Sequence, residues 1–287
     1  MSDTPHPENL RVRERGPLSR SAGPNLYYRW APARASRGTV LILHGFGEHS
    51  GRYEHVMGHL CGAGFSALAI DYRGWGLAEG KRGCLRRFED YVADALSGLD
   101  LARDKLQPDE PLFLLGHSQG GLLAARTAME EGTDLAGLIL SSPGLGVGME
   151  VPLFKRMLAS LVSRVLPDLS LPSGIPTEWL TTDPEMASRA NADPLVVRNG
   201  TARWLVETYR TQNLVEEGAA SITVPTLILV AGDERLVSTE ATRSFHDRLG
   251  TGDRTWIDYP GLRHELFNEL GRAQVLADLA AWVADRS

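Results

Sequence analysis

The sequence predicts an α/β protein in which a mostly parallel central sheet is flanked by helices and carries an inserted helical cap. Short apolar runs alternate along the chain with segments of helical periodicity, which is the order that βαβ units require. The runs are apolar almost throughout, as expected of strands buried on both faces. The alternation stops once, over residues 143–225, and a structureless loop of that length is not expected inside a compact domain.

Each element is assigned from its local pattern. The strands of the sheet are predicted at 39–43, 65–70, 112–115, 135–142, 226–230 and 254–259. The flanking helices are predicted at roughly 51–63, 85–105, 119–131, 238–249 and 271–285. The stretch from Leu10 to Trp30 is expected to add an antiparallel hairpin at one edge of the sheet.

The interval without strands is helix-like. Between residues 151 and 166, apolar residues such as Phe154 and Leu158 recur with i, i+3, i+4 and i+7 spacing, and a second helical pattern follows over 201–214. We therefore expect residues 1–142 and 218–287 to form the core, and residues 143–217 to form a helical cap. The cap leaves the carboxyl edge of the sheet, where open α/β sheets bind ligands.

Composition excludes several classes of protein. The formal net charge is -6, which argues against a nucleic-acid partner. No run of about 18 apolar residues predicts a membrane span, and the polar N-terminal stretch lacks the apolar segment of a secretory signal. Cys61 and Cys84 show neither C-x-x-C nor zinc spacing, so free thiols in a reducing compartment are expected. A cytoplasmic protein, able to touch a membrane surface peripherally, is the resulting expectation.

The segment GHSQG at 116–120 matches G-x-S-x-G, with a predicted strand before it and a predicted helix after it. This strand–turn–helix order is the setting of a nucleophile elbow, and it makes Ser118 the candidate nucleophile. Gly116 and Gly120 suit a crowded turn because they have no Cβ. The start of the following helix offers unpaired N–H groups and partial positive charge to an oxyanion.

A base and an acid are expected after the later strands, in the order Ser, acid, His. His264 follows the strand predicted at 254–259 and can exchange a proton with Ser118. Asp233 and Glu234 both follow the strand predicted at 226–230. Either carboxylate could fix the tautomer of His264 and stabilise its imidazolium, and spacing alone does not choose between them.

Four histidines cluster early in the chain, and histidine is a common metal ligand. His55 and His59 are four residues apart, but a zincin motif needs Glu directly after the first histidine, and Val56 stands there. His44 and His49 are the other two histidines of this stretch. The sequence therefore predicts no metal and no cofactor.

Five segments together resemble the monoacylglycerol lipase and lysophospholipase branch of the α/β-hydrolases. They are HGFGEHSGRY (44–53), DYRGWGLAEGKRG (71–83), GHSQGG (116–121), the acid loop around DERLV, and GLRHELFNE around His264. The resemblance runs over almost the whole chain, and HG-x-GEHSGRY is far more specific than G-x-S-x-G. It implies the α/β-hydrolase fold and hydrolysis of carboxylic esters of monoacyl lipids without a cofactor.

The resemblance also implies residue roles. Its HG-x loop supplies one oxyanion donor, here the Phe46 N–H, and the residue after the nucleophile supplies the other, here the Gln119 N–H. Its acid lies nine residues after the proline that opens the strand, here Pro225, which selects Glu234 and leaves Asp233 as the alternative. Members of the family usually carry Asp at this position, so Glu234 is a departure.

The sequence thus predicts a serine hydrolase that cleaves monoacylglycerols through an acyl-enzyme, with a small lipid ester as its partner. A lysophospholipase or a general carboxylesterase would share every catalytic residue. A carbon–carbon bond hydrolase and a non-catalytic ligand-binding protein of the same fold are the more distant alternatives. Ser118 excludes dehalogenases and epoxide hydrolases, which need Asp at that position. The apolar stripe of 151–166, flanked by Lys155, Arg156 and Arg164, is expected to pack onto the core, to line an acyl tunnel or to touch a membrane or micelle surface.

Overall fold

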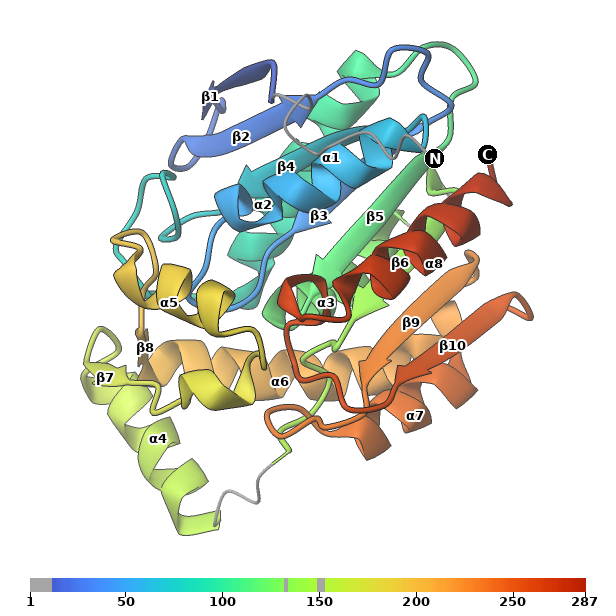
Figure 1. The fold of residues 1–287 in the computed structure, drawn as a ribbon. Helices are drawn as coiled ribbons and strands as arrows, with labels where there is room; N and C mark the ends of the chain where they lie inside the picture. The colour runs from blue at the N-terminus through green and yellow to red at the C-terminus, as the bar shows by residue number, and fades with distance from the viewer. Residues whose placement is uncertain (1–11, 132–133, 149–152) are drawn as a thin grey trace.

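A computed structural model describes residues 12–131, 134–148 and 153–287 (Figure 1). The polar N-terminal stretch as far as residue 11, which includes Leu10, lies outside these ranges. For residues 131 and 153–158 the structure describes the backbone only. The side chains of Phe154 and Leu158, which belong to the expected apolar stripe, are therefore among those that are not described. In the described ranges the strands form one large mixed sheet in the order β1-β2-β4-β3-β5-β6-β9-β10.

The sheet confirms the predicted α/β class. Its parallel strands are β3 (Thr39–Leu43), β4 (Ser66–Asp71), β5 (Leu112–His117), β6 (Gly137–Ser141), β9 (Thr226–Ala231) and β10 (Arg254–Tyr259). The antiparallel edge consists of β1 (Glu14–Leu18) and β2 (Leu26–Ala31), the expected hairpin. Every residue of β3, β4, β5, β6 and β9 is buried, which explains their continuous apolar character.

Helices cover both faces of the sheet. One face packs against α1 (Glu54–Gly62) and α8 (Arg272–Ala284), and the other against α2 (Phe88–Lys105), α3 (Gln119–Glu131) and α7 (Thr239–Arg248). Side chains alternate between the two layers along each strand. On β3, Leu41 and Leu43 join the second layer, while Val40 and Ile42 join the first.

The cap lies beyond the carboxyl ends of the central strands (Figure 1). It contains α4 (Leu153–Val165), α5 (Pro184–Ala192) and a small antiparallel hairpin of β7 (Ser170–Pro172) and β8 (Asn199–Thr201). The expectation of a purely helical insertion missed this hairpin, because three-residue strands are too short to give a periodic signal. It also missed α5, although Asp183-Pro184 marks its start and the Asp183 side chain accepts from the amides of Glu185 and Met186.

Helix α6 (Ala202–Gly218) connects the cap with the core. It packs against α4 on the cap side and against α2, α3 and α7 on the core side. Val215, near its C-terminus, belongs to the buried core layer that contains α2 and α3. The division of the chain at 217/218 remains a prediction. Among the helices of the described ranges, none is both long and apolar enough to cross a membrane.

Candidate active site

Ser118 occupies the sharp turn between β5 and α3. Its φ is +53°, a left-handed conformation that is strained for a residue with a side chain. A Cβ added to Gly116 would lie 2.1 Å from the carbonyl oxygen of Gly120, and a Cβ added to Gly120 would lie 2.2 Å from that of Leu43. Only glycine fits at both positions. The predicted elbow is therefore present, with Ser118 at its apex.

His264 and Glu234 complete a hydrogen-bonded line with Ser118. The Nε2 atom of His264 lies 2.8 Å from Ser118 Oγ, and its Nδ1 atom lies 2.9 Å from Glu234 Oε2. His264 follows β10 and Glu234 follows β9, so neighbouring parallel strands deliver them to the same edge of the sheet. Both side chains are almost fully buried.

Backbone amides fix the carboxylate of Glu234. Its Oε1 atom accepts from the N–H groups of Arg235, Leu236 and Val237 at 3.0, 2.8 and 3.3 Å, which leaves Oε2 for His264. Burial alone would raise the pKa of Glu234. The positive charge of His264, its hydrogen bond and the amides outweigh burial, and the pKa of Glu234 is lowered. This carboxylate is therefore ionised at neutral pH.

Asp233 has a different environment. Its carboxylate is partly exposed and pairs with Arg235 at 3.0 Å and with Arg263 at 3.4 Å. In the described structure it makes no hydrogen bond to His264. Of the two adjacent candidates, Glu234 is the one placed against the histidine.

The His264 ring has a raised pKa. Burial favours its neutral form, but the negative charge and hydrogen bond of Glu234 outweigh burial. His117 packs beside it, with 4.9 Å between the ring centroids. Burial, together with the positive charge of His264, lowers the pKa of His117 to about 3. His117 therefore stays neutral and adds no second positive charge next to His264.

The two amides expected to bind an oxyanion come from different parts of the chain: Gln119 directly follows Ser118, and Phe46 lies in the turn after β3. Gln119 begins α3, so its N–H has no acceptor within the helix. Phe46 lies in the turn after β3, next to Gly47 with φ +78°. This turn approaches the elbow closely, since a Cβ on Gly45 would lie 3.3 Å from Ser118 Cβ.

Ser118 and His264 open into a cavity between the core and the cap. The turn after β3 and Leu236 form its core side. The cap contributes a mostly apolar wall, with Ser173 and Arg198 as its more polar members: Ser173, Ile175, Thr177, Leu180, Ala190, Val196, Val197 and Arg198. A chain of methylene groups would find apolar contacts along this wall.

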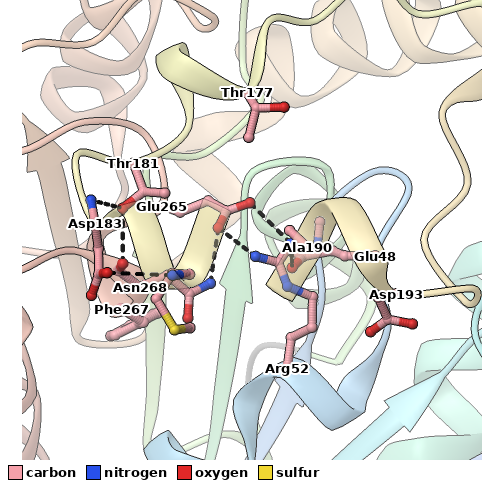
Figure 2. Close-up of polar contacts among 12 residues, drawn as sticks. Glu48, Arg52, Thr177, Thr181, Asp183, Ala190, Asp193, Glu265, Phe267 and Asn268 are labelled. Carbon is pink, nitrogen blue, oxygen red and sulfur yellow. Dashed lines mark hydrogen bonds and ion pairs between the residues drawn. The ribbon is translucent and has the colours of Figure 1, made fainter. Parts of the chain in front are cut away.

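A buried ion network, which we call the polar wall, forms another side of the cavity: Glu48, Arg52 and Glu265 (Figure 2). The Arg52 guanidinium lies 3.2 Å from a Glu48 oxygen and 2.6 Å from a Glu265 oxygen. Asn268 donates to Glu265 at 2.9 Å, and Tyr53 donates to Glu48 at 2.7 Å. Burial would raise the pKa of Glu265, but Arg52 lowers it.

The sequence analysis did not single out the polar wall. Arg52 and Glu265 are far apart in the chain and meet only after folding. A signal was nevertheless present, because Glu48 and Arg52 lie inside HG-x-GEHSGRY and Glu265 directly follows His264.

The early histidines do not converge. His49 bonds Asp193 at 2.8 Å, and His55 bonds the carbonyl oxygen of Phe267 at 2.7 Å. The Nδ1 atom of His44 lies 2.8 Å from the carbonyl oxygen of Gly45. Within the described residues, no group of three or more His, Cys, Asp or Glu side chains could hold a metal ion.

Comparison with known proteins agrees with this geometry. Residues 34–271 match the model of the serine aminopeptidase S33 family. The chain is 32% identical to a monoglyceride lipase of Homo sapiens over 98% of this chain and 94% of that protein. It is 30% identical to the phospholipase YtpA of Bacillus subtilis over 82% and 91% of the two chains.

Solved structures give the same result. The monoacylglycerol lipase of Paleococcus ferrophilus superposes with a TM-score of 0.83 at 30% identity, covering 91% of this chain and 99% of that one. The resemblance expected from the motifs is therefore confirmed. The chain belongs to the serine aminopeptidase S33 family of α/β-hydrolases, in the branch that contains the monoacylglycerol lipases.

Proposed function

We propose that this protein hydrolyses carboxylic esters of monoacyl lipids, with Ser118 as nucleophile, His264 as general base and Glu234 as the acid that orients it. One observation carries the proposal: Ser118 Oγ, the His264 ring and the Glu234 carboxylate form a line of hydrogen bonds of 2.8 and 2.9 Å at a strained elbow that opens into a cavity with an apolar wall. Similarity to a relative named as a monoglyceride lipase supports the same chemistry.

The reaction proceeds in two steps. His264 removes the proton of Ser118 while the serine oxygen attacks the ester carbonyl, and the Phe46 and Gln119 amides hold the resulting oxyanion. The tetrahedral intermediate collapses, His264 returns the proton to the departing alkoxide, and the alcohol leaves the acyl-enzyme. Water then attacks the acyl-enzyme with His264 again as base, which releases the fatty acid and restores Ser118.

The polar wall favours an uncharged, hydroxyl-rich head group. It contains two carboxylates and one guanidinium, so its formal charge is negative, and a phosphate placed against it would be repelled. Arg198 also reaches the cavity, but its guanidinium bonds the carbonyl oxygen of Ala190 and the side chain of Asn191. We therefore assign monoacylglycerols as the preferred class, ahead of lysophospholipids.

The outer surface of the cap supports contact with a lipid surface. Leu161 and Val165 lie one turn apart on α4 and are 59% and 69% exposed, and Leu166, Leu169 and Leu171 continue the apolar surface. Arg164 is exposed among them. The same cap segment continues into Ile175, which lines the cavity, so a substrate leaving a membrane or micelle there would have a short path to Ser118.

A cytoplasmic location is part of the proposal. Cys61 and Cys84 are both free thiols, which fits a reducing compartment.

A substrate panel tests the proposed function. Purified protein is assayed with monoacylglycerols, lysophosphatidylcholine, p-nitrophenyl acetate and an aminoacyl-p-nitroanilide, and Ser118→Ala serves as the blank. We expect the highest kcat/KM with monoacylglycerols. A preference for the lysophospholipid would contradict the head-group assignment alone. Turnover of only the anilide would contradict ester hydrolysis.

The polar wall is tested with one variant. Glu265→Gln retains the size of the side chain but removes one of the two carboxylates around Arg52, so the wall becomes less negative. We expect kcat/KM to fall for monoacylglycerol relative to p-nitrophenyl acetate, which has no polyol head group. A thermal melt must accompany the assay, because breaking a buried ion pair can cost about 3–5 kcal/mol of stability. An unchanged ratio in a folded variant would contradict a role of the wall in head-group recognition.

A further inference from the structure

Trp204 touches both residues whose amides are assigned to the oxyanion. Its indole N–H donates to the side-chain oxygen of Gln119 at 2.7 Å. Its ring packs on the Phe46 ring, with 4.3 Å between the centroids and 44° between the planes. Among the described residues that line the cavity, Phe46 is present and Trp204 is not. Trp204 therefore reaches the site through these two residues and not through the substrate.

The Gln119 side chain is a link in a longer chain of hydrogen bonds. Its amide nitrogen donates to the Tyr72 hydroxyl at 3.1 Å, and that hydroxyl donates to the carbonyl oxygen of His44 at 2.9 Å. Gln119, Tyr72 and His44 are all buried. A buried chain whose members are all bonded holds one geometry, because each break would leave a polar group without a partner. The chain thus ties the start of α6 to both the elbow and the loop that carries Phe46.

Phe46 is also held from two sides. Trp75, which comes from a different part of the chain than Trp204, meets the Phe46 ring edge-on at a centroid distance of 5.1 Å. A Cβ on Gly200 would lie 3.2 Å from the Phe46 ring and 3.1 Å from the Trp204 ring, so the absence of a side chain lets β8 pack closely here. Trp204 itself is anchored, since its backbone N–H donates to the Thr201 hydroxyl that caps α6. The Phe46 backbone has little freedom to move away from Ser118.

We propose that Trp204 is a positioning residue for the reaction, which holds the Phe46 and Gln119 amides in the arrangement that the oxyanion requires. This inference rests on the proposed function. It makes the chemical step depend on how α6, the helix that joins cap and core, is seated. Preorganised donors stabilise an oxyanion only when they already lie at hydrogen-bonding distance from its position, so a small displacement of either amide lowers kcat.

The test compares two Trp→Phe variants of the full-length protein. Trp204→Phe keeps an aromatic ring on Phe46 but removes the N–H that bonds Gln119. Trp282→Phe is the matched control, because Trp282 lies on α8 away from the site and its N–H donates to the Thr255 hydroxyl on β10 at 3.2 Å. The substrate is p-nitrophenyl acetate, which is too short to report on the acyl wall. A short trifluoromethyl ketone serves as the oxyanion analogue.

For Trp204→Phe we expect kcat to fall about tenfold, KM to stay unchanged and the inhibition constant of the ketone to rise by the same factor, as for loss of one neutral hydrogen bond. Trp282→Phe should match the wild type in all three quantities. In a Gln119→Met background, which retains the backbone amide but lacks the acceptor, Trp204→Phe should cause no further loss. A wild-type kcat in folded Trp204→Phe, a change in KM alone, or an equal loss in the Gln119→Met background would each overturn the inference. A wild type without esterase activity would instead contradict the proposed function.

Discussion

The core and the cap meet at one cavity but are built in opposite ways. Ser118, Glu234 and His264 follow β5, β9 and β10, whose registers are fixed by their neighbours in the sheet, and the line between them is buried. The cap instead exposes leucines and a valine on α4 and β7, and a few contacts join it to the turn after β3. Two of these are the Val197 N–H to the Gly47 carbonyl oxygen at 2.7 Å and His49 to Asp193 at 2.8 Å.

This difference in construction assigns the chemical step to the core and the selection of substrates to the cap. Groups that must stay within a few tenths of an ångström of one another belong on strand ends, whereas a surface that admits lipids of varied length tolerates looser attachment. Changes at the strand ends should therefore abolish turnover of every ester, and changes on the outer cap should affect only large or aggregated substrates.

The largest effect is expected from Ser118→Ala. Without the hydroxyl no acyl-enzyme can form, and kcat should fall by a factor on the order of 10⁶ for short and long esters alike. The fold should be retained, because Ser118→Ala leaves the close contacts of Gly116 and Gly120 unchanged and alanine can adopt the same turn. Initial rates with p-nitrophenyl acetate and with a monoacylglycerol measure turnover of the short and of the long ester. Residual turnover of one substrate class only would show that a second group acts on it.

The acid loop gives the next largest effect. Glu234→Gln keeps the shape of the side chain but removes the charge that stabilises the His264 imidazolium, so kcat should fall by about 10⁴. Asp233→Asn should stay within a factor of about three of the wild type, since its exposed pairs with Arg235 and Arg263 are surface ion pairs of small energy. The two variants are matched controls for each other. A crippled Asp233→Asn together with an active Glu234→Gln would reverse the assignment.

The pH dependence follows from the raised pKa of His264. The base must be neutral to accept the Ser118 proton, so kcat/KM should be full at high pH and fall tenfold per unit once the pH drops below this pKa, which lies above the ordinary value of 6.5. In Glu234→Gln the charge that raises the pKa is gone while burial remains. The midpoint of its residual activity should therefore move to lower pH. A midpoint that is the same in both proteins would contradict the coupling of His264 to Glu234.

The smallest effect is expected on the cap. Leu161→Asp and Val165→Asp place charges on the exposed apolar surface, and kcat/KM for dispersed long-chain monoacylglycerol should fall about tenfold through weaker partition into the lipid surface. Turnover of p-nitrophenyl acetate should not change. Leu270→Asp serves as a control, because Leu270 is 66% exposed but lies in the loop before α8. An equal loss for both substrates would show that this part of α4 does not act through lipid contact.

Much of the core could be predicted from the sequence, because its signals are local. Buried strands are continuous apolar runs, and the elbow needs glycines at fixed spacing around Ser118. The choice between Asp233 and Glu234 could not be made from spacing. It depends on the folded conformation of the loop, in which the backbone amides of the following residues bind the Glu234 carboxylate and place it against His264. The pairing of Arg52 with Glu265 and the bond from Trp204 to Gln119 join residues that only the folded chain brings together. The short strands β7 and β8 of the cap are too short to show a periodic pattern of apolar residues.

Active-site labelling tests the central claim most directly. The protein is treated with a fluorophosphonate, which phosphonylates a serine only when a base and an oxyanion site activate it, and the adduct is mapped by mass spectrometry of peptides. The account predicts one adduct, on Ser118, at a rate that falls sharply in Glu234→Gln and is zero in Ser118→Ala. Labelling at another serine, or none in folded wild type, would contradict it.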